Sequence, residues 1–455
     1  MKFIYADSLD YIDPAYDFIA DKNPDGRKPY WDDLYPHEYM DELPYHGVLV
    51  SRAIVGDGPV GGGKYSAPQA QRFRRDGARA FLRLNKPRFE QMPIFGDCGA
   101  FAYHREEIPP YSPEDMVSFY DDGGFTHGCS VDHIIFDFDE RYMSNVDGAS
   151  SEARRRYDIT LANAAAFLST ASRLSNRFTP VGVIQGWSPG SMAAAAKELC
   201  KMGYRYLAVG GTVMLKPDQI KSCLHAIRTA IPTDIAMHVL GFAKADDITD
   251  FVKYDITSFD TTSPLLRAFK DGKRNYYVRK PDGRLDYYTA IRVPQAIENP
   301  KLQRLAKRGV YRQEDLLSLE RRALAALRAY DREESGLDET LDAVMAYGTP
   351  AMFEGEQSIA ASPRKISELR TRYRRTLSDR PWKHCDCAVC RQVSIEVVLF
   401  RASNRNKRRG IHNLGVFKML VDGLPDTESS GNGKIDLFGH TGAAESVEHG
   451  AIVCS

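Results

Sequence analysis

The chain has 455 residues, of which 43% are hydrophobic and 11% aromatic, so it can bury a large core and is not disordered. Its 61 basic and 61 acidic residues cancel, so any affinity for a polyanion must come from local clusters of charge. The first residues, MKFIYADSLD, lack the apolar core of a signal peptide, and no segment has an uninterrupted apolar run of membrane-spanning length. We therefore expect a soluble protein of the cytoplasm.

Short apolar runs alternate with amphipathic, helix-like stretches through the first two thirds of the chain. The predicted strands are 47–53, 92–97, 132–139, 181–186, 206–211, 235–242, 256–260 and, as a further candidate, 287–293. Eight strands that alternate with helices predict a (β/α)8 TIM barrel. An open doubly wound sheet is the alternative. Polar or glycine residues end nearly every strand, which favours the barrel, because barrel enzymes carry their chemistry at the carboxyl ends of the strands.

The predicted barrel leaves four other segments of the chain. We expect residues 1–46 to wrap the barrel, and residues 47–300 to form the catalytic core. The helical patterns of residues 301–380 predict an insertion, and residues 381–420 a zinc-binding subdomain. Residues 421–455 are rich in Gly and Ser and predict a loose tail.

Three of the eight cysteines are packed into the segment HCDCAVC, and a histidine follows later in the chain. Thiolates at Cys385, Cys387 and Cys390 and the imidazole of His412 supply the four ligands of a closed tetrahedral zinc site. Four protein ligands leave no position for water, so we expect one structural zinc ion per chain.

Aspartates end several of the predicted strands: Asp97, the pair Asp137 and Asp139, and Asp260. Each could cap the helix that follows it, which is the commoner role of Asp at such a position. Several carboxylates on one barrel rim are harder to explain by capping, and carboxylates gathered in a pocket tune one another's pKa.

The glycine-rich segment GPVGGGKY (58–65) is similar to a phosphate-binding loop, but Tyr65 stands where a magnesium-binding Ser or Thr is needed. We expect a flexible loop beside the mouth of the active site.

A collinear set of short motifs resembles those of the tRNA-guanine transglycosylase family. The matching segments are Asp97–Phe101 (Asp-Ser-Gly-Gly-Phe in the family), Phe138–Glu140 (Phe-Asp-Glu), Ile184–Gly186 (Val-Gln-Gly), Val209–Gly211 (Ile-Gly-Gly), Ser258–Asp260 (the nucleophile segment) and Cys385–Cys390 with His412–Leu414 (the zinc box). The resemblance covers roughly residues 47 to 420, and the set with its zinc box is far more specific than any one piece.

The resemblance implies a mechanism and a role for each matched residue. Asp260 is the expected nucleophile at C1′ of a guanosine, and Asp97 the general acid and base. Phe101 is expected to stack on the base, and Asp139 or Asp137 to hold its amino and ring N–H groups. The remaining expected base-binding residues are Gln185, Gly186, Gly210 and Gly211.

Several sequence differences from the bacterial tRNA enzyme bear on whether the substrate is DNA or tRNA. Cys98, Ala100 and Ala102 replace Ser, Gly and Gln, the segment after Asp260 differs, and little sequence follows His412 for appended RNA-binding domains. These features are most similar to the DpdA-type branch, which inserts 7-cyano-7-deazaguanine into DNA. We therefore expect DNA as substrate, a 7-deazaguanine base as co-substrate and possible partner proteins of a DNA-modification system. A tRNA enzyme, a catalytically inactive nucleic-acid-binding member and a zinc-stabilised TIM-barrel hydrolase such as a glycosidase remain alternatives.

Two basic clusters are candidates for the polymer-binding surface. The first, within SPRKISELRTRYRRTLSDR, is as easily a solvated helix face. The second lies between the zinc ligands, where we expect contact with phosphates. The second cluster consists of Arg401, Arg405, Lys407, Arg408 and Arg409.

Overall fold

Eight parallel strands close into a barrel in the computed structural model, which describes residues 1–59, 62–242, 245–353 and 356–425. The strands are β1 (Lys2–Ala6), β2 (Gly47–Ser51), β3 (Ile94–Asp97), β4 (His127–Cys129), β5 (Thr179–Ile184), β6 (Tyr206–Val209), β7 (Ala236–Val239) and β8 (Ser258–Thr261). β1 closes the barrel by pairing with β8, in a register that sets Ile4 opposite Asp260. The predicted TIM barrel is confirmed.

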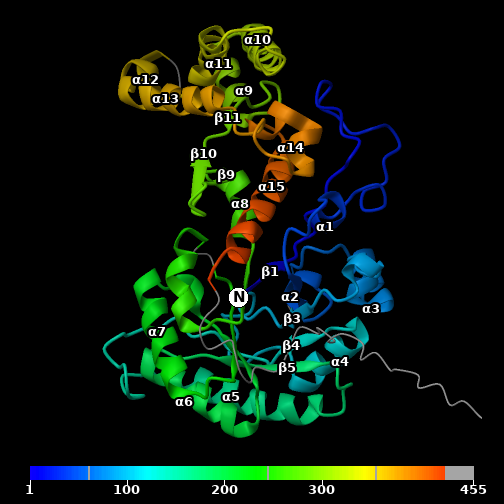
Figure 1. The fold of residues 1–455 in the computed structure, drawn as a ribbon, viewed down its shortest axis with the longest axis vertical. Helices are drawn as coiled ribbons and strands as arrows, with labels where there is room; N and C mark the ends of the chain where they lie inside the picture. The colour runs from blue at the N-terminus through cyan, green and yellow to red at the C-terminus, as the bar shows by residue number, and fades with distance from the viewer. Residues whose placement is uncertain (60–61, 243–244, 354–355, 426–455) are drawn as a thin grey trace, which may run out of the picture.

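Helices surround these strands in the lower part of Figure 1. Several begin at a Ser-Pro pair, where the serine hydroxyl caps the first turn and proline supplies a preset φ; Ser112 and Ser188 cap α4 and α6 in this way. The helices up to Lys270 are α1 (Pro36–Tyr39), α2 (Arg52–Val55), α3 (Ala67–Phe81), α4 (Pro113–Gly123), α5 (Ser151–Ala171), α6 (Pro189–Met202), α7 (Pro217–Ala230) and α8 (Ser263–Lys270), with 3-10 helices η1 (Pro87–Phe89), η2 (Thr212–Met214) and η3 (Ala245–Tyr254).

The first and last strands of the barrel differ from the prediction. The first strand is Lys2–Ala6, inside the segment expected only to wrap the barrel, and the predicted strand 47–53 is the second. The candidate strand 287–293 is wrong as a barrel strand, because its residues fall in β10 and β11, which belong to two separate small sheets. The sequence pattern does not predict this five-residue strand, because no helix pattern precedes it to mark it as part of the alternation.

The fourth strand was also misplaced. β4 is His127–Cys129, and the more apolar run 132–139 follows it as a loop. Gly128 has low strand propensity, yet it is required here, because a Cβ at this position would lie 2.5 Å from the ring of Tyr120. Tertiary packing thus selects a strand that local propensity does not favour.

A second layer of the molecule stands on the α8 side of the barrel. Its helices α10 to α13 lie at the end of the molecule opposite the barrel, at the top of Figure 1. Its elements are β9 (Tyr276–Arg279), β10 (Leu285–Tyr288), β11 (Ile291–Arg292), α9 (Pro300–Lys307), α10 (Gln313–Asp331), α11 (Leu337–Met352), α12 (Glu356–Ala360), α13 (Pro363–Asp379), α14 (Ala388–Val393), η4 (Ser394–Val398), β12 (Leu399–Phe400) and α15 (Ser403–Asp422). The predicted tail lies mostly in residues 426–455, outside the described part of the chain.

Side-chain alternation divides the core into an inner and an outer part. Ile4 of β1 packs inside the barrel with Phe95, Val183 and Tyr206, whereas Phe3 packs outward against the helices. A separate apolar cluster holds the second layer together. Among the described helices, none is both long and apolar enough to cross a membrane.

Candidate active site and metal centre

Three carboxylates meet at the carboxyl ends of the barrel strands. Asp97 ends β3, Asp260 lies in β8, and Asp132 follows β4 by three residues. Burial, together with the negative charges of Asp260 and Asp132, raises the pKa of Asp97 to about 7, against the opposing hydrogen bond from Ser51. Asp97 Oδ1 is buried without a hydrogen-bond partner within the described residues. A carboxyl group in this state can hold and release a proton near neutral pH.

Asp260 is buried and held through one of its two oxygens. Oδ1 accepts a hydrogen bond from the backbone N–H of Gly241 at 2.9 Å, and His238 Nε2 lies 3.1 Å from the same oxygen. No group of the described residues donates to Oδ2. One oxygen is therefore fixed and the other is available for chemistry.

His238 belongs to a chain of buried polar groups inside the barrel. Its Nδ1 lies 2.6 Å from Ser258 Oγ, and this hydroxyl lies 2.5 Å from the Tyr206 hydroxyl. When Tyr206 donates to Ser258 and Ser258 donates to Nδ1, the imidazole carries its proton on Nε2 and donates it to Asp260. The ring of His238 also stacks on Phe95, with ring centres 5.2 Å apart. The histidine is thus fixed in position.

Asp132 is held by donors from two neighbouring strand ends. Gln185 Nε2 donates to Oδ2 at 2.7 Å, and Cys98 Sγ donates to Oδ1 at 3.2 Å. Burial raises the pKa of Asp132. The amide of Gln185 lies against Gly210, where a Cβ would come within 2.4 Å of Nε2. The structure therefore brings Gln185 and Gly210 together with the carboxylates, and Gly211 adjoins them with a left-handed φ of +71°.

Gly186 packs tightly where β5 passes into α6. A Cβ at Gly186 would lie 2.7 Å from Ser191 Oγ, so a side chain does not fit. The predicted residues of the β5 and β6 ends thus lie on one rim of the barrel.

Asp137 and Asp139, predicted to read the base, lie in the loop after β4, where the backbone N–H of Asp139 donates to the carbonyl oxygen of Trp187. Asp137 is exposed and accepts a hydrogen bond from Ser150 at the start of α5. Asp139 forms an ion pair with Arg141, which lowers the pKa of Asp139 to about 2. Because β4 ends at Cys129, the first carboxylate beyond it is Asp132, which the sequence analysis did not single out.

Phe101 lies in the loop after β3 and is 52% exposed. Phe136, from the loop after β4, contacts it edge to face with ring centres 5.9 Å apart and is 41% exposed. Two exposed aromatic rings from neighbouring active-site loops offer a surface on which a planar base can stack.

The predicted metal ligands converge on one point. Cys385 Sγ, Cys387 Sγ and Cys390 Sγ lie 3.5, 3.4 and 3.5 Å from His412 Nδ1, and the four ligand atoms all lie within 4.8 Å of one another. Zinc–sulfur and zinc–nitrogen bonds of about 2.3 and 2.0–2.1 Å in a tetrahedron give an S···N distance of roughly 3.6 Å. The spacing and the donor atoms therefore fit a tetrahedral metal ion.

The surroundings of His412 fix its ring for this role. Its Nε2 lies 2.8 Å from the carbonyl oxygen of Tyr277, so the proton sits on Nε2 and Nδ1 faces the sulfurs. Asn413, the next residue, donates to the carbonyls of Pro264 and Asn275. The metal centre is thereby tied to the start of α8, which follows Asp260.

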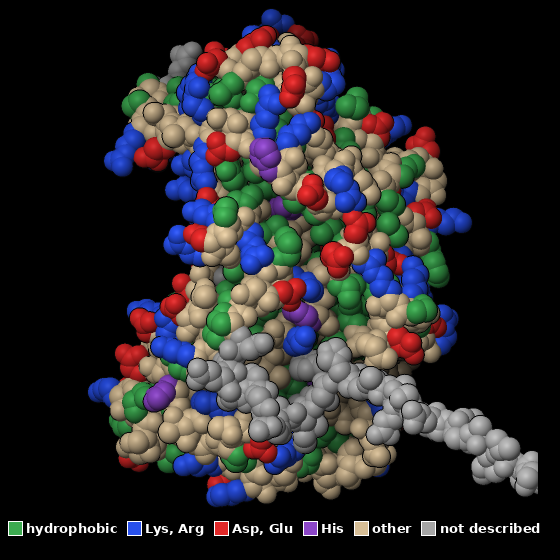
Figure 2. Space-filling model, viewed as in Figure 1, with side chains coloured by type: hydrophobic (Ala, Val, Ile, Leu, Met, Phe, Trp, Pro, Cys, Tyr) green, Lys and Arg blue, Asp and Glu red, His purple; other side chains and the backbone are tan. Residues whose placement is uncertain are grey.

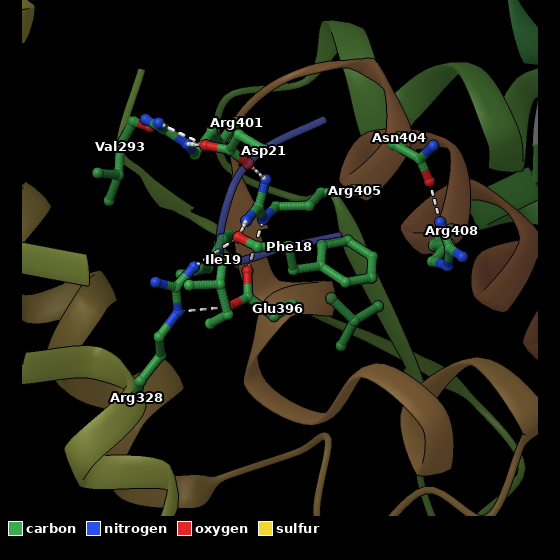
Figure 3. A network of polar contacts seen from close by, with 12 residues as sticks. Phe18, Ile19, Asp21, Val293, Arg328, Glu396, Arg401, Asn404, Arg405 and Arg408 are labelled. Carbon is green, nitrogen blue, oxygen red and sulfur yellow. Dashed lines mark hydrogen bonds and ion pairs between the residues drawn. The ribbon is translucent and has the colours of Figure 1, made fainter. Parts of the chain in front are cut away.

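The second basic cluster does not form a polymer-binding surface. Arg401, Arg405, Arg408 and Arg409 are each at most 5% exposed. Figure 3 shows guanidinium groups of this cluster directed at protein partners. The prediction of phosphate contact is wrong for these four arginines, because buried charges already paired inside the protein cannot reach a phosphate.

The partners of these arginines come from distant parts of the chain. Arg401 pairs with Asp21 and Glu320, and Arg405 with Asp21 and Glu396. Arg409 donates to the carbonyls of Val397, Leu399 and Ala268, Arg408 to that of Asp13, and the half-buried Lys407 to that of Tyr11.

A comparison with curated proteins identifies the family. The chain is 41% identical over 418 residues to a DNA-guanine transglycosylase of Salmonella montevideo, a match that covers 91% of this chain and 95% of that protein. The chain belongs to the DNA-guanine transglycosylase family. No protein-family model matches it.

The metal centre of this DNA-guanine transglycosylase family member can be tested by removing one ligand. Cys387→Ser should lose the bound metal and lower the melting temperature, because metal binding to a closed site contributes directly to folding. Elemental analysis and thermal melting are the measurements. Cys200→Ser is the matched control, since Cys200 lies on α6 outside the cluster. Full metal content in Cys387→Ser would contradict the assignment.

The raised pKa of Asp97 predicts a pH-dependent effect on stability. Between its ordinary value of 3.8 and about 7, the folded protein keeps a proton that the unfolded chain releases, so the stability of the unsubstituted protein falls as pH rises. Asp97→Asn does not titrate. Its melting temperature should exceed that of the unsubstituted protein by a few degrees at pH 8, and the gain should shrink as pH falls toward 4.

Asp139→Asn is the control for this measurement. Arg141 lowers the pKa of Asp139 from 3.8 to about 2, so its influence is confined to acid solution. A gain for Asp97→Asn that does not change between pH 4 and 8 would show that Asp97 is not the titrating group.

Proposed function

We propose that this protein exchanges guanine in DNA for a 7-deazaguanine, 7-cyano-7-deazaguanine, through a covalent glycosyl ester on Asp260. The observation that carries the proposal is that two buried carboxylates, Asp97 and Asp260, lie at the same barrel rim in different environments. Asp97 has a pKa raised to about 7, whereas Asp260 is anchored by His238 and Gly241 through a single oxygen. Environments that separate two carboxylates in this way assign one the role of acid and the other that of nucleophile.

In the first half-reaction, Asp260 Oδ2 attacks C1′ of the target nucleotide as the C1′–N9 bond breaks. The protonated carboxyl of Asp97 gives its proton to the departing guanine. The hydrogen bonds to Oδ1 keep the carboxylate in place while positive charge develops on the sugar. The products are free guanine, an ionised Asp97 and a DNA strand joined to Asp260 by an ester.

The second half-reaction reverses these steps with a different base. Ionised Asp97 takes the N9 proton of the incoming 7-deazaguanine, N9 attacks C1′, and the ester to Asp260 breaks. Two displacements at C1′ retain its configuration. Both carboxylates return to their starting protonation states, so no redox cofactor or net proton transfer is needed.

We assign recognition of the guanine edge to Asp132 rather than to Asp137 or Asp139. A guanine offers two adjacent donors, N1–H and the 2-amino group, which a carboxylate can accept together. Asp132 lies on the same rim as Asp97 and Asp260, and Gln185 already orients it. Gly210 and Gly211 leave room beside Gln185 for the carbonyl edge and the 7-substituent.

Phe101 would stack on the purine face. The target base must leave the DNA stack to reach a barrel rim, and an exposed aromatic side chain offsets part of the lost stacking.

The metal is proposed to be zinc, held by Cys385, Cys387, Cys390 and His412, because three thiolates and one imidazole suit this ion. Four protein ligands give it a structural role, with no open position for substrate.

The experiment that tests the function follows a labelled base into a polymer. The protein, with any partner it needs, is incubated with labelled 7-cyano-7-deazaguanine and either DNA or tRNA. We expect label in DNA and release of guanine, since the relative is named a DNA-guanine transglycosylase and the match covers 95% of its length. Label in tRNA and never in DNA would overturn the polymer, and hydrolysis without incorporation would indicate a glycosidase.

Three variants test the residue roles in the same assay. Asp260→Asn should abolish both base exchange and the trapping of a protein–DNA adduct. If the protein were a catalytically inactive family member, the unsubstituted protein would show neither. Asp132→Asn should lose exchange, because one of its oxygens becomes a donor facing the donors of guanine. Asp139→Asn is the matched control at an ion-paired aspartate and should keep exchange. Equal activity of Asp132→Asn and Asp139→Asn would contradict the assignment.

His238 is a positioning residue. Two substitutions, each of which keeps a nitrogen at the place of only one ring nitrogen, should separate its contact with Asp260 from its contact with Ser258. In His238→Gln the side-chain amide nitrogen can occupy the place of Nε2, next to Asp260, whereas in His238→Asn it can reach only the place of Nδ1. His238→Asn should lower kcat by about 10- to 100-fold, the effect of losing one hydrogen bond to a charged group. His238→Gln should recover part of this loss, and KM for DNA should change little in both. Equal kcat in the two variants would indicate a structural role only.

A further inference from the structure

A cavity of about 610 Å³ lies between α8 of the barrel and the second layer, outside the site described above. Its barrel side is formed by α8 and the turn that follows it, and its other side by β11, Phe400 and α13. Leu266, Leu369, Tyr373 and Phe400 give it an apolar floor.

The charged residues that line this cavity are almost all cations. Lys270 and Lys273 lie on the barrel side, and Arg292 and Arg372 on the opposite side. Within the described residues, none of these four side chains forms an ion pair, and Arg372 Nε is buried without a hydrogen-bond partner. Asp271 is the one carboxylate in the lining, and it accepts hydrogen bonds from the backbone N–H groups of Lys273 and Arg274.

Other arginines of α13 are neutralised, which sets Arg372 apart. Arg370 pairs with Asp342, Arg374 with Asp338, and Arg375 with Asp286. Figure 2 shows that Lys and Arg side chains gather along the edge of the molecule between the barrel and helices α12 and α13. The first basic cluster of the sequence therefore contributes Arg372 to the cavity, while its other members stabilise the second layer.

The position of α8 relates the cavity to the nucleophile. Ser263 lines the cavity and follows Asp260 by three residues, and Lys270 ends the same helix. A helix of eight residues is about 12 Å long. Because a DNA strand advances about 3.4 Å per nucleotide along the axis, this length corresponds to roughly three or four nucleotides.

We propose that this cavity binds the DNA strand that flanks the target base, with the four cations on its phosphates and the apolar floor against sugars or unstacked bases. The inference rests on the proposed action on DNA. Cations on two facing walls above an apolar floor are the pattern by which proteins hold an extended nucleic-acid strand. The cations come from separate elements on two sides of the cavity, which suits a chain of phosphates better than a single small anion.

The test compares two triple variants of the full chain that lose the same formal charge. The cavity variant is Lys270→Gln, Lys273→Gln and Arg372→Gln, and the control is Arg364→Gln, Arg370→Gln and Arg374→Gln on the ion-paired face of α13. Binding to a guanine-containing DNA duplex is measured by fluorescence anisotropy across a salt series. The cavity variant should bind at least about 10-fold more weakly, and its salt dependence should flatten by about 2 to 3 in log–log slope, since each phosphate contact contributes about 0.9. The control should bind like the unsubstituted protein.

The outcomes separate the cavity from the proposed function. If the unsubstituted protein binds and modifies DNA and the two triple variants bind it equally, the cavity proposal is overturned while the function stands. If label enters tRNA only, and the cavity variant loses tRNA binding, both the DNA-strand assignment and the choice of polymer are overturned. The single variant Lys273→Glu, at an exposed turn, repeats the test with a charge reversal that does not depend on packing. Unchanged DNA binding in that variant would also count against the proposal.

Discussion

The pairing of β1 with β8 is the constraint on which the rest of the structure depends, because it closes a sheet whose strands all run in one direction. Every carboxyl end then faces the same rim. Residues far apart in the chain, from Asp97 on β3 to Asp260 on β8, meet there without any long-range side-chain recognition. The same closure satisfies the hydrogen bonds of the strand edges, so the loops are free to differ in sequence and to carry the chemistry.

Carboxylates gathered at one rim repel one another when they are ionised, and each of the three has different neighbours. Burial and its neighbours raise the pKa of Asp97, so near neutral pH it holds a proton for part of the time. Asp260 instead accepts a hydrogen bond from the backbone N–H of Gly241 on Oδ1, and His238 Nε2 lies 3.1 Å from the same oxygen. Asp132 is held by Gln185 and Cys98. Three chemically identical groups thereby acquire three different environments.

Helix α15 connects the parts of the molecule. It carries His412 of the metal centre and, about two turns earlier, the buried Arg405, which pairs with Asp21 and Glu396. Arg401, which pairs with Asp21 and Glu320, lies just before the helix. These carboxylates come from the segment after β1, the helical insertion and η4. Breaking one such pair would leave an uncompensated buried charge, so the network fixes the relative positions of these elements more than it adds net stability.

The sequence by itself determined the features that depend on local pattern. Alternating apolar and amphipathic stretches predicted the barrel, and Cys-x-Cys-x-x-Cys with a later His predicted the ligand cluster, because closely spaced ligands converge almost wherever the chain goes. Asp97 and Asp260 were singled out as carboxylates at predicted strand ends, and Gln185 was added by the resemblance to the transglycosylase family; the structure places all three at the carboxyl ends of barrel strands.

Only the tertiary structure decided which short segment forms the fourth strand and which charges are buried. The three-residue strand β4 exists because its neighbours β3 and β5 supply its partners, whereas the sequence analysis predicted the more apolar run 132–139, which follows β4 as a loop and contains Asp137 and Asp139. The run Arg401–Arg409 is typical of a solvated basic surface, yet Arg401 and Arg405 pair with Asp21 and Glu320, which lie 81 to 384 residues away in the chain. Whether a charge faces solvent or a buried partner depends on contacts between distant segments, and these contacts exist only once the chain has folded.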